Sequence, residues 1–188
     1  MGCQMFCDDF EIDFVEGDLL DFEGDAIVVN TNVRLNLNYK LGKAVLEKTG
    51  EDLDKELQCV LSDRFSGKDL PLGTAVSTNS YGMSDQIRKL IFVSWWNQDN
   101  EYTINHIFKV HTAAIREADA LGLRTIAFPL MGRGHRVKYS IIAEGIANTI
   151  NELNKLERRF SVEKVVFISF QKEDADNVRL LVKTKICL

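Results

Sequence analysis

The chain has 188 residues, of which 45% are apolar and 27% are charged, so it suits one folded domain and is too apolar to be disordered. Its 23 basic and 28 acidic residues give a net charge of −5, which argues against a general nucleic-acid-binding surface. No apolar run approaches the roughly 18 residues that a membrane-spanning helix needs.

The first third of the chain predicts two strands and two helices. Residues 10–16 alternate apolar and charged side chains, which is typical of a half-exposed strand, and we expect it at the edge of a sheet. Residues 26–30 form a short apolar run, which indicates a strand buried on both faces, as in parallel sheets. A polar loop over 31–40 follows, and then helical patterns cover 41–49 and 51–61, separated by a glycine.

The rest of the chain alternates strands with helices. Two long segments repeat apolar residues at helical spacing, which predicts amphipathic helices. Short apolar runs predict the strands, and Asp174 is a residue type that caps helix N-termini. In chain order we expect strands over 73–79 and 90–94, a helix over 104–121, a strand over 125–129, a helix over 139–158, a strand over 165–170 and a helix over 174–182.

Strands that alternate with helices indicate an α/β fold. We expect a three-layer α/β/α sandwich with a mixed, largely parallel central sheet of about six strands. One domain is expected to span residues 1–188, with residues 1–9 as an N-terminal extension. Ligands of such sheets bind beyond the carboxyl ends of the strands, which draws attention to the segments after Asn30, Pro129 and Phe170.

A glycine-rich loop after the fifth predicted strand has features of an anion site. Gly132 and Gly134 would let backbone N–H groups approach a phosphate, and the helix that follows adds partial positive charge. Arg133, Arg136 and Lys138 beside them favour an anion further. The alternative is a plain strand-to-helix turn, because the loop matches neither a dinucleotide fingerprint nor a P-loop.

Polar and aromatic residues near other strand ends suit a nucleotide. Asp18 could accept a hydrogen bond from an amino group such as that of adenine, or it could form a turn. Asn30 and Asn32 could bind sugar hydroxyls, or they too could serve turn chemistry. Phe170 could stack on a base or pack in the core.

The spacing of the three histidines and four cysteines predicts no metal site. His106 and His111 fall on a predicted helix, so His135 in the glycine-rich loop is the one acid–base candidate. Trp95 and Trp96 either wall a cleft or lie buried under the long helix. Unpaired cysteines, and acidic residues where a secretory signal would be apolar, predict a cytoplasmic protein.

Six short motifs follow one another along the chain. They are Gly17-Asp18-Leu19, Asp25 to Asn32, Leu72 to Thr78, Leu123 to Pro129, Met131 to Gly134, and Val166 to Phe170. In this order they resemble the motifs of the macrodomain family, which binds ADP-ribose. The resemblance extends from about residue 10 to about residue 181 and therefore covers most of the chain.

The resemblance implies a role for each residue already singled out. An acidic residue would accept the adenine amino group, an aromatic ring would stack on the adenine, backbone N–H groups would hold the diphosphate, and amides would bind the distal ribose. The expected ADP-ribose-binding residues are Asp18 with Leu19 for the adenine amino group, Phe170 for stacking, Gly132, Arg133, Gly134 and His135 for the diphosphate, and Asn32 with Asn30 for the distal ribose.

The sequence departs from the family where its hydrolases carry catalytic groups. Residues 38–42 stand where the family has Gly-Gly-Gly, and no acidic residue follows them as in one hydrolase branch. The other branch uses a lysine and an aspartate, and here Ser94-Trp95 and Arg136 stand in their places. Neither hydrolase residue set is therefore intact.

Three hypotheses about function remain open. The chain binds ADP-ribose or a derivative, free or protein-attached; or it is an ADP-ribosyl hydrolase, acting by de-ADP-ribosylation or O-acyl-ADP-ribose deacylation; or it is a degenerate macrodomain that serves as a protein-interaction module. As a hydrolase it would use Asn32 to position the ribose and water, with His135 or else Lys40 or Lys43 in place of the missing acid. We expect no cofactor, a monomer, no membrane span, and ADP-ribose or an ADP-ribosylated protein as the partner.

Overall fold

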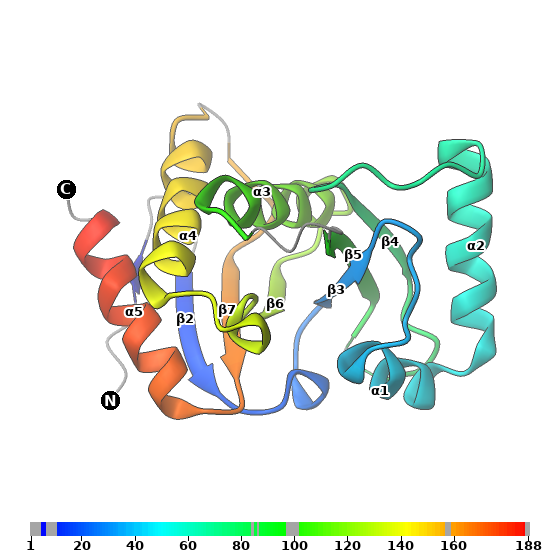
Figure 1. The fold of residues 1–188 in the computed structure, drawn as a ribbon, viewed down its shortest axis with the longest axis horizontal. Coiled ribbons are helices and arrows are strands. Elements are labelled where there is room, and N and C mark those ends of the chain that lie inside the picture. The colour runs from blue at the N-terminus through cyan, green and yellow to red at the C-terminus, as the bar shows by residue number, and fades with distance from the viewer. Residues whose placement is uncertain are drawn as a thin grey trace.

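The computed structural model describes residues 5–6, 11–83, 85, 87–96, 102–156 and 159–186. Within them a seven-stranded sheet has the order β1-β2-β7-β6-β3-β5-β4 (Figure 1). The strands are β1 (Met5–Phe6), β2 (Glu11–Glu16), β3 (Ala26–Asn32), β4 (Ala75–Asn79), β5 (Lys89–Trp96), β6 (Thr125–Pro129) and β7 (Lys164–Ser169).

The sheet is mixed and largely parallel, as predicted. β2, β7, β6, β3 and β5 run parallel to one another, whereas β1 and β4 pair antiparallel at the two edges. All six predicted strands are present, and β1 is an addition from the predicted N-terminal extension. Because the five inner strands point the same way, their carboxyl ends meet along one edge of the sheet.

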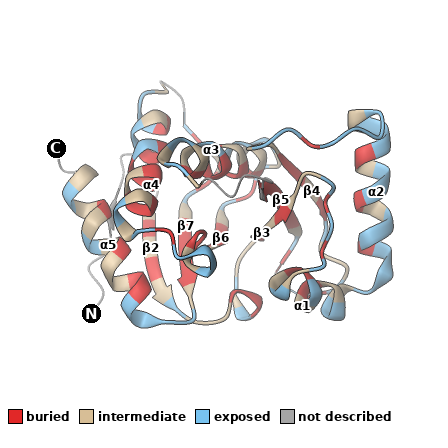
Figure 2. Ribbon diagram, in the orientation of Figure 1, coloured by how far each residue is buried: buried red, intermediate tan, exposed pale blue. Residues whose placement is uncertain are grey.

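Helices cover both faces of the sheet, which gives the three-layer sandwich. One face carries α3 (Ile104–Ala120), α4 (Tyr139–Asn154) and α5 (Lys172–Ile186), and the other carries α1 (Lys40–Thr49) and α2 (Glu51–Phe65). Figure 2 shows buried residues along the strands and on the inward side of the helices. Among the described helices, none has the length and apolar character required to cross a membrane.

The apolar run of β3 is continuous because both of its faces are covered. Ala26 and Val28 pack into the core beneath α3, α4 and α5, whereas Ile27 and Val29 pack into the core beneath α1 and α2. All four side chains are fully buried. A strand buried on both faces shows no polar alternation, so this strand could be recognised from the sequence.

The prediction that residues 10–16 form an edge strand is wrong. β2 lies between β1 and β7 in the sheet. Its acidic residues do not mark an open edge, because Glu11 pairs with Lys164 at 2.8 Å and Asp13 faces Arg179 at 3.6 Å. Glu11 and Asp13, which alternate with apolar residues in this strand, thus form ion pairs with neighbouring elements.

Helix boundaries also differ from the predictions, most clearly in α2, α4 and α5. α2 continues to Phe65 and ends at Ser66, which adopts the left-handed conformation with φ 54°. α4 ends at Asn154, before the predicted end at 158, and residues 157–158 lie outside the described part. α5 begins at Lys172, so Asp174 does not cap it but lies buried in its first turn.

Of the four cysteines, only Cys59 lies in the described part of the chain, where it is a free, exposed thiol. Cys3, Cys7 and Cys187 lie outside the described residues.

Candidate functional site

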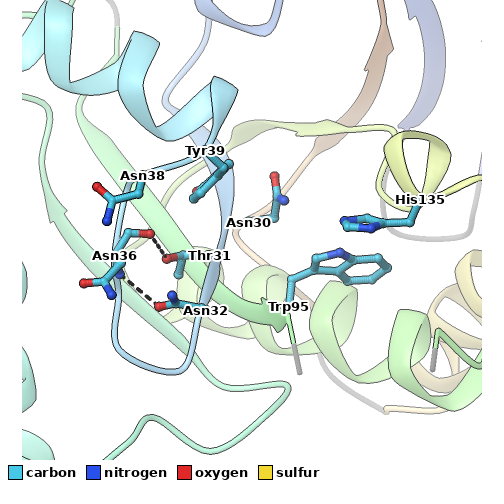
Figure 3. A pocket seen from close by; sticks show the side chains of 8 residues that line it. All are labelled: Asn30, Thr31, Asn32, Asn36, Asn38, Tyr39, Trp95 and His135. Carbon is cyan, nitrogen blue, oxygen red and sulfur yellow. Dashed lines mark hydrogen bonds between the residues drawn. The ribbon is translucent and has the colours of Figure 1, made fainter. Parts of the chain in front are cut away.

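A cavity of about 370 Å³ opens at the carboxyl ends of β3 and β5 (Figure 3). This volume is in the usual range for small-molecule sites. The described residues that line it include no carboxylate, lysine or arginine. They are Asn30, Thr31 and Asn32 of β3, Asn36, Asn38 and Tyr39 of the loop that follows, Trp95 of β5 and His135 of the glycine-rich loop.

Asn32 shapes the loop that forms one wall of the cavity. Its Oδ1 accepts hydrogen bonds from the backbone N–H groups of Arg34 and Asn36, both at 3.0 Å. The Thr31 hydroxyl donates to the carbonyl of Asn36 at 3.0 Å, so two adjacent β3 residues hold the same loop (Figure 3). The Asn32 amide oxygen is therefore used within the protein, and its NH₂ group remains to face a ligand. The turn role and the ligand role predicted for Asn32 are compatible.

Close packing of α1 against the loop brings Tyr39 to the cavity. Gly42 is buried in α1, and a Cβ atom at this position would lie 2.7 Å from the carbonyl oxygen of Leu37. Leu37 itself is buried, which anchors the loop in the core. Tyr39 is the residue just before α1, and burial raises the pKa of its hydroxyl above the ordinary value, which keeps this group neutral.

Trp95 both walls the cavity and belongs to the core, so the two predicted roles are again compatible. It is 1% exposed and stacks on Tyr102, with ring centroids 4.8 Å apart and an angle of 13° between the rings. The Trp96 side chain lies outside the described part. Tyr102 in turn contacts His135, with ring centroids 4.6 Å apart, so an aromatic column joins the end of β5 to the glycine-rich loop.

His135 lines the cavity, and burial lowers the pKa of its imidazole below the ordinary value. The effect comes from partial desolvation of the ring beside Tyr102. The Tyr102 hydroxyl lies 3.4 Å from Nε2 of the ring.

The glycine-rich loop follows β6 and includes the 3₁₀ turn η2 (Arg133–His135). Gly132 adopts the left-handed conformation with φ 97°, and the N–H of His135 donates to the Gly132 carbonyl at 3.1 Å. This N–H is thus already used, which leaves Gly132, Arg133 and Gly134 as the remaining backbone donors predicted for the diphosphate.

The expectation that the Arg133 side chain favours an anion is not supported by its contacts. Its guanidinium donates to the Asp174 carboxylate at 3.0 Å and to the Tyr139 hydroxyl at 3.1 Å. Because the buried carboxylate compensates the charge of the guanidinium, Arg133 attracts an anionic ligand only weakly. Arg136 and Lys138 remain exposed beside the loop.

Asp18, Leu19 and Phe170 lie on neighbouring strand ends, outside the cavity lining. Asp18 follows β2 and caps the 3₁₀ turn η1 (Leu19–Asp21), with Oδ1 accepting the N–H of Leu20 at 2.9 Å. Leu19 is buried, with 4% of the residue exposed. Phe170 follows β7 and is 66% exposed, which excludes the alternative of core packing, and its stacking role stays a prediction.

The two lysines considered as substitutes for the missing acid do not line the cavity. The Lys40 ammonium lies 5.5 Å from the centroid of the Phe170 ring, and Lys43 is exposed on α1. Of the three proposed substitutes, only His135 reaches the cavity.

Sequence reasoning gave no ligand role to four of the lining residues: Thr31, Asn36, Asn38 and Tyr39. A signal was available, because three asparagines and a threonine follow one another within eight residues of the end of a buried strand. Short polar side chains at that density mark a loop that is built by side-chain hydrogen bonds.

The Macro domain family profile matches residues 28–141, which is more than half of the chain. The chain belongs to the macrodomain family. This macrodomain is 26% identical over 162 residues to histone macroH2A1.1 of Capsaspora owczarzaki, covering 85% of this chain and 42% of that protein. It is 24% identical over 157 residues to the human protein mono-ADP-ribosyltransferase PARP14, covering 81% of this chain and 8% of that protein. The macrodomain thus spans less than half the length of these two relatives.

Solved structures agree with this assignment at the level of the fold. A mutant of the Oceanobacillus iheyensis macrodomain with ADPR superposes with a TM-score of 0.82, at 20% identity, over 99% of both chains. The same bacterial macrodomain with ADP gives a TM-score of 0.80, at 20% identity, over 98% of this chain and 96% of that one.

Proposed function

We propose that this macrodomain binds ADP-ribose, either free or attached to a protein. The observation that carries the proposal is the cavity beside the glycine-rich loop, whose described lining residues carry no acidic or basic side chain other than His135 and offer amide and hydroxyl groups that suit a sugar. Support comes from the Oceanobacillus iheyensis macrodomain, which has the same fold and is described with ADPR and with ADP.

The order of strands along the sheet supports an extended ligand. Asp18 follows β2, Phe170 follows β7, the glycine-rich loop follows β6, and the cavity lies at β3. These four strands are consecutive neighbours in the sheet. Adenine, diphosphate and distal ribose would therefore occupy successive positions along about 14 Å, which is three strand spacings.

The experiment that tests this proposal is calorimetric titration of the protein with ADP-ribose, ADP and AMP. We expect ADP-ribose to bind most tightly and AMP most weakly, because ADP lacks the sugar that fills the cavity and AMP also lacks half of the diphosphate. Equal affinity for AMP and ADP-ribose would contradict the proposal. Absence of binding would favour the hypothesis of a degenerate interaction module.

A second candidate function is hydrolysis of an ADP-ribosyl linkage. The observation that favours it is His135 in the cavity wall, since burial lowers the pKa of its imidazole and keeps it in the neutral form that accepts protons. Against it stands the absence of a carboxylate among the described lining residues. Incubation with an ADP-ribosylated protein, comparing the native chain with His135→Ala, distinguishes binding from turnover.

A further inference from the structure

Arg133, Tyr139 and Asp174 form a compact cluster behind the glycine-rich loop, which we call the loop clamp. Besides its bonds to Asp174 and Tyr139, Arg133 donates through Nη1 to the carbonyl of Val137 at 3.0 Å. The Tyr139 hydroxyl donates to the same Asp174 oxygen at 2.6 Å. The guanidinium also lies over the Tyr139 ring, 4.1 Å from its centroid, so each of the three side chains contacts the other two.

The clamp is largely withdrawn from water, which strengthens its contacts. The Asp174 side chain is 10% exposed and that of Arg133 is 28% exposed. Charge-assisted hydrogen bonds in such surroundings are stronger than those between neutral groups. Removing one partner leaves the other charge poorly solvated, so the three side chains act as one unit.

The loop that the clamp contacts has an unfavourable backbone conformation, which its surroundings must stabilise. Gly132 and Arg136 have positive φ angles of 97° and 57°, and for an arginine this conformation is unfavourable. Arg133 lies near the start of this segment and bonds Val137 at its end, so one guanidinium ties the two ends together. Asp174 then fixes that guanidinium to α5, which is 41 positions away in the sequence.

We propose that Asp174 is a positioning residue for the diphosphate: through Arg133 and Tyr139 it fixes the backbone N–H groups of the glycine-rich loop in the arrangement that binds the ligand. The inference rests on the proposed function and explains how this site positions the N–H groups that bind its anion. The sequence favours Arg133 as part of an anion site. In this proposal its side chain acts on the diphosphate indirectly, by fixing the conformation of the loop backbone.

The direction in which one substitution changes the affinity for an anion distinguishes positioning from simple electrostatics. Asp174→Asn removes a negative charge directly behind the loop while keeping the size of the side chain. If charge alone mattered, less repulsion and a released Arg133 would tighten the binding of an anion. If Asp174 positions the loop, the same substitution weakens binding.

The test measures ADP-ribose and ADP affinities of Asp174→Asn and Tyr139→Phe by calorimetry. We expect Asp174→Asn to weaken both ligands by the same factor, roughly 10- to 100-fold, the scale of losing one charge-assisted hydrogen bond. Tyr139→Phe keeps both charges of the clamp and should give a smaller loss. It also keeps the proposal testable if Asp174→Asn fails to fold.

Glu144→Gln provides the matched control. Glu144 of α4 pairs with Lys185 of α5 at 2.7 Å, so this variant also removes a carboxylate that joins α5 to the rest of the molecule, but outside the clamp. We expect it to leave both affinities unchanged. Amide resonances of Gly132 and Gly134 should shift in Asp174→Asn and stay in place in Glu144→Gln, and this readout requires no ligand.

Each remaining outcome overturns the proposal. Unchanged or tighter binding by Asp174→Asn, equal losses in Glu144→Gln, or a loss confined to ADP-ribose would show that Asp174 does not position the loop for the diphosphate. If the native chain binds neither nucleotide, the proposed function fails. The glycine resonances then decide separately whether the clamp holds the loop.

Discussion

Phe170 presents its ring at the surface, beside the carboxyl edge of the sheet. Because 66% of the residue is exposed, Phe170→Ala should change the free energy of unfolding by less than about 0.5 kcal/mol. Loss of a stacking face should nevertheless weaken ADP-ribose binding by about 1–3 kcal/mol, as for base–aromatic stacking in nucleic-acid sites. Calorimetry and thermal unfolding of the same preparation measure the two effects.

Leu180→Ala is the control for this prediction, since Leu180 is 63% exposed on α5 and does not line the cavity. It should leave affinity unchanged. Retained affinity in Phe170→Ala would show that the ring does not stack on the ligand.

In the proposed site, single residues have a structural role and also face the cavity. The Asn32 amide oxygen builds the loop while its NH₂ group stays available, and Trp95 is a core residue that also walls the cavity. The sequence raised both roles as alternatives for each residue. Such alternatives do not exclude each other where the two ends or faces of one side chain have different neighbours.

At the scale of elements, the position of α1 determines the shape of the cavity. A methyl group at Gly42 would lie 2.7 to 2.9 Å from three backbone atoms of Leu37, so Gly42→Ala must push α1 and the loop apart. We expect a loss of about 1–3 kcal/mol in stability, as for other overpacked sites. ADP-ribose affinity should fall while ADP affinity changes little, because Tyr39 lines only the cavity end of the site. Thermal unfolding and paired titrations check both parts.

Lys43→Ala tests whether introducing an alanine into α1 is by itself enough to change stability and affinity as expected for Gly42→Ala. Lys43 is the exposed neighbour of Gly42 on α1, and alanine is a good helix former, so this variant should keep native stability and affinity. A Gly42→Ala protein that behaves like Lys43→Ala would show that α1 tolerates the extra methyl group and that the close approach does not set the cavity.

The sequence predicted those elements whose signal is local. The apolar runs of β3, β6 and β7 identified the strands, and their ends identified Asn30, Asn32 and Phe170 as residues at one edge. The loop clamp had no such signal, because Arg133 and Asp174 are 41 positions apart and meet only once α5 has packed. Tyr39 was missed for a similar reason, since its place depends on the approach of α1 to Leu37.

At the scale of the whole molecule, an ionisable group, His111, is fully enclosed in the core beneath α3, α4 and α5. His111 lies against Phe128 and Phe167, with ring centroids 5.0 and 5.4 Å away. Its Nδ1 lies 2.7 Å from the carbonyl oxygen of Ile107, and because that oxygen only accepts, Nδ1 must carry the proton. Burial lowers the pKa of this imidazole to about 4, so His111 is neutral at physiological pH.

This neutral histidine predicts how stability depends on pH. In the unfolded chain His111 takes up a proton near pH 6.5, whereas in the folded protein it does so only near pH 4, so between these values the unfolded state binds more protons. The free energy of unfolding should therefore be complete above pH 6.5 and decline as pH falls toward 4, by roughly 3 kcal/mol at most. His111→Asn keeps a donor toward the Ile107 carbonyl but cannot titrate, so its unfolding free energy, followed by urea denaturation from pH 7 to pH 4, should decline less steeply. An identical decline in both proteins, or an NMR titration that places His111 near pH 6.5 in the folded state, would show that the core tolerates the charged ring.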